Sequence, residues 1–118
     1  MKFYRVEWPD GEGLYRKGAA GLGNELSDFE RHPMPFEDAE LADYYDTAME
    51  IGSSNFRFAF ASIEQLKYWI YRTEWRKILH DKGLKIAVIE ADGFHGDTQA
   101  MYEKESRVDI EFLSLVEV

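Results

Sequence analysis

The run LKIAVIEA at residues 84–91 constrains the fold more than any other part of the chain. It is continuous, apolar and rich in β-branched residues, which is typical of a strand buried on both faces. Such a strand needs neighbouring strands for its backbone hydrogen bonds and other layers to cover its faces. The remaining residues are therefore expected to supply a sheet and helices that pack on it.

Two further strands are predicted earlier in the chain. Side chains alternate in KFYRVEW, residues 2–8, with Val6 and aromatic residues on one side, and PDGEG then supplies turn residues. FRFAF, residues 56–60, also alternates and places its three phenylalanines on one face. Both patterns indicate strands of a sheet.

The C-terminal third predicts a hairpin and a last strand. DGFHGDT at 92–98 is typical of a turn, and TQAMYEK at 98–104 is expected to return from it beside the buried run. RVDIEFLSLVEV at 107–118 alternates at Val108, Ile110 and Phe112. This part of the chain favours an antiparallel sheet.

The middle of the chain predicts helices. Ser62 followed by Gln65 matches the S-x-x-Q capping box, and apolar residues then recur at helical spacing from Ile63 to Ile70. Another helical stretch follows Thr73 and ends near Gly83. The pattern leaves open whether residues 63–82 form one bent helix or two.

The stretch ERHPMPFEDAE at 30–40 predicts the start of an earlier helix. Prolines restrict the backbone of HPMP to extended shapes, and Glu37 and Asp38 would then fall in the first helical turn, where acids suit the helix dipole. The helix is expected over 36–50. A glycine-rich connection with a helical turn near 25–31 is expected before it, and a ligand contact by His32 stays open.

These elements predict a fold of the α+β class. We expect a single domain over residues 1–118, with a mostly antiparallel sheet and two to three helices. No internal repeat or low-complexity linker divides the chain.

Charge is the main clue to partners. The formal net charge is −9, and residues 25–50 hold nine acids against the single base Arg31, whereas residues 63–87 hold six bases against three acids. Direct nucleic-acid binding is disfavoured, because phosphate repels such a surface. A protein with a basic surface is the expected partner, contacted through Glu37, Glu40, Asp43, Asp46 and Glu50. The alternative is that these acids only keep the protein soluble.

Several classes of site are not expected. The chain has no cysteine, which excludes disulfides and thiolate metal sites, and its three histidines are scattered, so no metal site is predicted. No apolar run is long enough for a membrane span, and no signal peptide is expected before the first turn. The predicted location is the cytoplasm.

The order of several short motifs resembles a group of small accessory proteins of bacteriophages and prophages. The motifs are YRVE at 4–7, G-x-G-L-Y at 11–15, HPMPFED at 32–38, FAFAS-x-E-Q-L-x-x-W at 58–69, AVIE at 87–90 and Q-x-x-Y at 99–102. This resemblance implies a protein that acts on host or defence machinery, as an inhibitor that works by protein contact and needs no cofactor.

The same order also resembles a minimal ADP-ribosyltransferase. That resemblance implies that Arg5 on the first strand holds NAD, that Ser62 ends a pocket-lining strand, and that Glu103 or Glu105 stabilises the ribose cation. A guanidinium can grip phosphate and a carboxylate can stabilise developing positive charge. The motif FAS differs from the usual Ser-Thr-Ser, and Gln99 could occupy the late-strand position. The sequence thus carries two hypotheses, an acidic inhibitor and an NAD-using enzyme, and leaves the target and the oligomeric state open.

Overall fold

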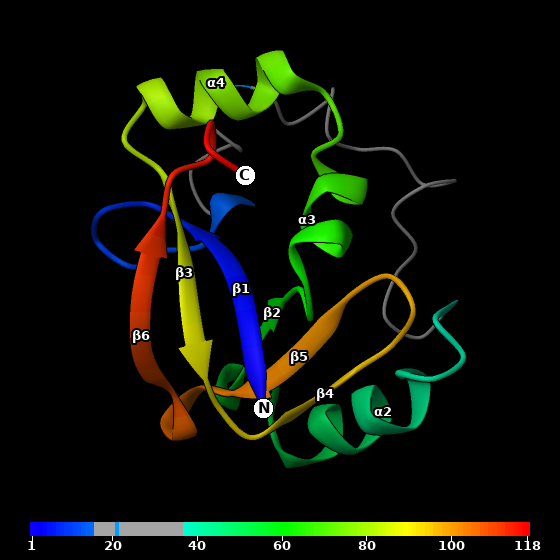
Figure 1. Ribbon diagram of the computed structural model, residues 1–118. Helices are drawn as coiled ribbons and strands as arrows, with labels where there is room; N and C mark the ends of the chain where they lie inside the picture. Colours follow the sequence, from blue (N-terminus) through cyan, green and yellow to red (C-terminus); the bar gives the residue numbers. More distant parts are fainter. Residues whose placement is uncertain (16–20, 22–36) are drawn as a thin grey trace.

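The structure is a computed structural model that describes residues 1–15, 21 and 37–118 (Figure 1). The predicted helical turn near 25–31, His32 and the prolines beside it lie outside the described residues. The elements in chain order are β1 (Lys2–Glu7), α2 (Ala42–Ile51), the 3-10 turn η3 (Ser53–Asn55), β2 (Phe56–Ala59), α3 (Ile63–Trp69), α4 (Thr73–Asp81), β3 (Lys85–Glu90), β4 (Gly93–His95), β5 (Ala100–Glu103), the 3-10 turn η4 (Lys104–Ser106) and β6 (Val108–Leu113).

The strands form two antiparallel sheets of three strands. One has the order β1-β3-β6 and the other the order β2-β5-β4. The sheets meet where Tyr4 and Phe60 exchange two backbone hydrogen bonds, each 2.8 Å between nitrogen and oxygen. Together with helices α2, α3 and α4, this confirms the predicted α+β class.

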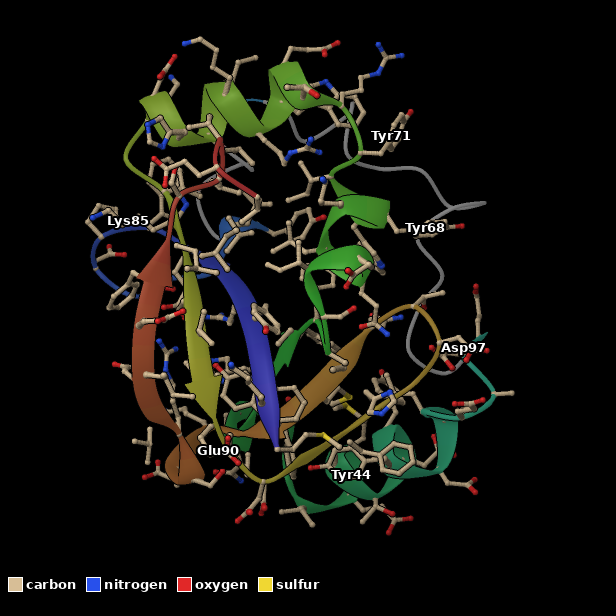
Figure 2. The ribbon with its side chains drawn as sticks, in the orientation of Figure 1. Tyr44, Tyr68, Tyr71, Lys85, Glu90 and Asp97 are labelled. Atoms are coloured by element: carbon tan, nitrogen blue, oxygen red, sulfur yellow. The ribbon has the colours of Figure 1, made fainter. Side chains whose placement is uncertain are left out.

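The buried run is the central strand of its sheet. Ile86, Ala87, Val88 and Ile89 of β3 are at most 1% exposed, and the strand pairs with β1 on one side and β6 on the other. Figure 2 labels Lys85 and Glu90, the two exposed residues at its ends. The prediction of a strand buried on both faces is confirmed.

The predicted hairpin partner is wrong. The return strand forms as β5, but it pairs with β4 and β2 in the second sheet and not with β3. The segment predicted as a turn contains β4 itself, so the hairpin is β4–β5. The change of sheet occurs because β1 and β6 already occupy both edges of β3.

Helices α3 and α4 cover one face of the first sheet. Four residues pack with Val6 of β1 and with other buried residues of that face: Leu66 and Ile70 from the α3 region, and Trp75 and Leu79 from α4.

Residues 63–82 form two helices, which answers the question that the sequence left open, because Ile70 leaves helical geometry and Arg72 is extended. The predicted cap is confirmed, since Ser62 Oγ accepts a hydrogen bond from the Gln65 amide at 3.1 Å.

The other face of the first sheet packs on the second sheet. Phe3 of β1 stacks on Tyr102 of β5 with ring centroids 5.7 Å apart, and several alanines fill the space around them. Helix α2 covers the outer face of the second sheet, where Tyr44 lies against Phe94 and Phe56 (Figure 2). Layers thus follow in the order α3 and α4, first sheet, second sheet, α2.

The predicted start of the first long helix is wrong. Helix α2 begins at Ala42, so Glu37 and Asp38 precede it. Asp38 is only 6% exposed, and its Oδ2 accepts hydrogen bonds from the backbone nitrogen and the hydroxyl of Thr98 at 3.2 and 3.1 Å. The carboxylate expected to favour a helix dipole therefore ties the chain to the β4–β5 loop.

The predicted alternation of the last strand is interrupted. The pairing of β3 with β6 shifts between Val88 and Ile89, so that Glu111 and Asp109 face these neighbours and Ile110 is an extra residue. Because the bulge breaks the period of two, Val108, Ile110 and Phe112 do not form one buried face. All three are at least half exposed.

Gly96 offers a test of the Asp38 contact. A Cβ atom on Gly96 would overlap the Asp38 carboxylate. We expect Gly96→Ala to lower the free energy of unfolding by about 1–3 kcal/mol, as overpacking does elsewhere. Urea denaturation measures this change. In an Asp38→Ala background the same substitution is expected to cost less, and an equal cost in both backgrounds would contradict the contact.

Candidate functional site

A buried ionic cluster lies at the C-terminal end of β1. Glu7 is 4% exposed, and its Oε2 accepts hydrogen bonds from Arg5 and from Arg107, the latter at 2.5 Å. Its Oε1 accepts a second bond from Arg107 Nη2 at 2.8 Å. One buried carboxylate thus holds two guanidinium groups, one of which comes from a residue 100 positions away.

Arg107 is held firmly in this cluster. Besides its two-pronged contact with Glu7, its Nε donates to Asp109 Oδ1 at 2.8 Å. The hydrogen bonds that the Arg107 guanidinium donates to Glu7 raise the pKa of Arg107 above its ordinary value, although burial opposes this. The cluster therefore fixes the start of β6 against β1 across the width of the sheet.

Arg5, a predicted catalytic residue, is engaged in the same structural role. Its Nε donates to the Phe58 carbonyl of β2 at 3.2 Å, and its Nη1 donates to the Gly11 carbonyl at 3.3 Å as well as to Glu7. Gly13 lies over the guanidinium, where an added Cβ would come within 2.6 Å of Nη2. Arg5 therefore joins β1, β2 and the turn after β1.

Beside Arg5 the described residues line a partly open cavity of about 670 Å³. This volume lies in the usual range for a small-molecule site. The cavity is bordered by the turn after β1, by β2 and by the end of α3. Its lining residues are Arg5, Val6, Asp10, Gly11, Glu12, Gly13, Leu14, Tyr15, Phe56, Arg57, Phe58, Ala59, Phe60, Trp69, Ile70 and Gln99.

The three residues assigned to catalysis do not come together at this cavity. Arg5 lines it, whereas Ser62 and Glu103 do not. Ser62 caps α3, and Glu103 stands at the far end of β5, opposite Phe56. Gln99, the alternative for the late-strand position, does line the cavity and is 5% exposed. Glu105, in η4, is exposed and does not line it either.

The five acids predicted to bind a partner are all exposed. They are Glu37, Glu40, Asp43, Asp46 and Glu50, and they define what we call the acidic face. Within residues 1–15, 21 and 37–118, no cation forms an ion pair with any of them. Residues 37–50 contain six acids and no lysine or arginine. The sixth acid, Asp38, is the one turned inward.

Helix α2 directs three of these acids away from the protein. Asp43, Asp46 and Glu50 follow spacings of three and four residues, so they share one side of the helix. The buried Ala48 and the half-buried Tyr44 lie on the opposite side. Figure 1 shows α2 at the outside of the molecule, far from α3 and α4.

The charge of the acidic face is unfavourable for the protein itself. Like charges three or four residues apart destabilise a helix by about 0.2–0.5 kcal/mol per pair. Glu50 also lies in the last turn, which contains no base to satisfy the negative end of the helix dipole. Nearby, burial together with the Glu103 and Asp92 carboxylates raises the pKa of Tyr44. Cations brought by a partner would relieve this repulsion.

Metal and membrane sites receive no support from the described part of the chain. No group of three or more His, Asp or Glu side chains gathers there in a way that could hold a metal ion. None of the described helices is long and apolar enough to cross a membrane.

The sequence analysis missed Glu7 and Arg107. Both were assigned to strands with no role, yet they form the buried ionic cluster with Arg5. An acid beside an arginine on one face of a strand is a weak signal of a buried pair. The contribution of Arg107 had no local signal at all, because it comes from the far end of the chain.

The buried ionic cluster predicts a large effect of neutralising Glu7. We expect Glu7→Gln to lower the free energy of unfolding by about 3–5 kcal/mol, because it leaves two partly buried guanidiniums without their carboxylate. The matched control is Asp109→Asn, whose side chain is 56% exposed and whose loss should cost less than about 1 kcal/mol. Chemical denaturation compares the two variants, and equal small losses would show that the cluster contributes little.

Comparisons with known proteins identify the family. A family model described as Bacteriophage T4 Y00F protein matches residues 1–116. Searches of curated proteins and of solved structures each returned no significant match. The match confirms the phage part of the resemblance, and the ADP-ribosyltransferase part stays a prediction. The chain belongs to the Bacteriophage T4 Y00F protein family.

Proposed function

We propose that this phage protein acts by stoichiometric contact with a host or defence protein, in the cytoplasm of the host cell. The acidic face is the contact surface, and the target carries a basic surface of the kind that normally holds nucleic acid. The observation that carries the proposal is the set of five exposed acids without any ion pair among the described residues.

The geometry of α2 supports this mode of action. A convex helix with three outward carboxylates can enter a groove shaped for a phosphate backbone, and complementary charge speeds the encounter. Binding would also relieve the repulsion within the helix and the unfavourable position of Glu50 in its last turn. No covalent chemistry is needed, so the protein acts as an inhibitor that occupies the site.

Charge reversal tests the proposal. We expect the triple variant Asp43→Lys, Asp46→Lys and Glu50→Lys to lose capture of basic proteins from host lysate by about tenfold or more. Immobilised protein, quantitative mass spectrometry of the captured proteins and circular dichroism of the variant make the measurement. Competition by double-stranded DNA is expected to release the same proteins, because both ligands would occupy one basic surface.

A matched control separates local contact from total charge. The exposed acids Glu64, Glu74 and Glu117 lie on α3, on α4 and near the C-terminus. Changing these three to lysine alters the net charge equally but leaves the acidic face intact. Loss of capture in both triple variants would contradict a specific docking surface, as would undiminished capture by the α2 variant.

A second candidate function has one observation in its favour. Arg5 on β1, the whole of β2 and Gln99 just before β5 line one cavity, which is the layout that the resemblance to ADP-ribosyltransferases implies. The cavity thus supports binding of NAD or a related nucleotide. Transfer chemistry has less support, because Gln99 carries no charge to stabilise a ribose cation and Arg5 is engaged by Glu7.

Calorimetry tests the nucleotide candidate directly. If the cavity binds NAD, titration should give measurable heat, which Gln99→Ala should weaken while leaving the fold intact by circular dichroism. Ser62→Ala is the matched control, because Ser62 caps a helix outside the cavity and its loss should leave the heat unchanged. Absence of heat at millimolar NAD would remove this candidate and leave the acidic-face proposal untouched.

A further inference from the structure

The outer edge of β6 is an exposed strand edge. β6 is the last strand of the order β1-β3-β6, and no strand among the described residues pairs with its other side (Figure 1). Val108, Ile110 and Phe112 are 62%, 50% and 57% exposed. Such an edge offers unpaired backbone donors and acceptors, and proteins commonly protect it with charged side chains, above all lysine, with proline, with a bulge or with a covering segment. β6 has a bulge at Ile110 and two acids, but neither lysine nor proline.

The bulge gives the two acids of β6 different surroundings. Asp109 lies opposite Ile89, on the face of the buried ionic cluster, and its Oδ1 accepts a hydrogen bond from Arg107. Glu111 lies opposite Val88, on the other face, is exposed and has no ion pair within the described part of the chain. The edge therefore presents apolar side chains around one uncompensated carboxylate.

A second copy of the chain fits this edge poorly. A two-fold axis at Glu111 would set that carboxylate against its copy on the same face of the joined sheet. Like charges directly opposite each other destabilise paired strands. The net charge of −9 on each copy adds to this repulsion.

We propose that the edge of β6 binds an extended segment of another protein, which pairs with Val108–Leu113 as an added strand. Its backbone completes the hydrogen bonds of the sheet. A lysine or arginine of the segment lies beside Glu111, and apolar side chains cover Val108, Ile110 and Phe112. This surface is separate from the acidic face of α2, so its partner segment can belong to the same target or to another one.

Two designed peptides test the proposal. One alternates lysine and valine over eight residues, and the other alternates glutamate and valine. We expect the lysine peptide to bind more tightly by about threefold or more, from fluorescence anisotropy of the labelled peptides. It should also slow hydrogen exchange of the amides in residues 108–113. A lysine peptide with alternate backbone nitrogens methylated should bind weakly, because it cannot pair along the edge.

Charge variants locate the binding on the protein. Glu111→Lys is expected to reverse the preference between the two peptides, whereas Asp43→Lys on α2 makes the same charge change and should leave the preference intact. Equal binding of the methylated peptide, or exchange protection that avoids residues 108–113, would overturn the inference. So would a dimer in sedimentation with β6 already protected, because a second copy would then occupy the edge.

Discussion

The carboxylate of Glu7 is the constraint on which the arrangement of the strands depends. It binds Arg5 of its own strand and Arg107 at the start of β6, and Arg5 in turn holds β2 and the turn after β1. Because these groups are mostly buried, each is stable only while its partners are present. Polar contacts therefore join both sheets at one point, and the apolar layers of β3 and the helices complete the fold around it.

This construction leaves the proposed docking surface on the periphery. Asp38 turns inward and ties the segment before α2 to the β4–β5 loop, and the exposed acids lie in that segment, at Glu37 and Glu40, and on α2 itself. The cavity beside Arg5 is bordered by the turn after β1, by β2 and by the end of α3, and none of these acids lines it. A docking helix and a small-molecule cavity can thus coexist without sharing a residue, and their proposed activities can be separated by experiment.

Local patterns predicted the elements well, and long-range pairing limited the rest. The buried run, the strand over 2–8 and the cap at Ser62 follow from their own neighbours in sequence, and all three were found. The switch of β5 to the second sheet, the bulge at Ile110 and the late start of α2 each depend on residues far along the chain. The exposure of the acidic face could be anticipated, because it follows from local spacing along the chain. The separation of Ser62 and Glu103 from Arg5 could not, because it depends on how distant segments pair.

The most direct test of the account is a hydrogen-exchange map of the protein bound to a captured basic target. The account predicts slowed exchange concentrated in α2, Ala42–Ile51, because that helix would lie within the interface. Residues 10–15 and 56–60, which border the cavity, should exchange as they do in the free protein. Protection of the cavity border with unchanged exchange in α2 would contradict the claim that the acidic face is the docking surface.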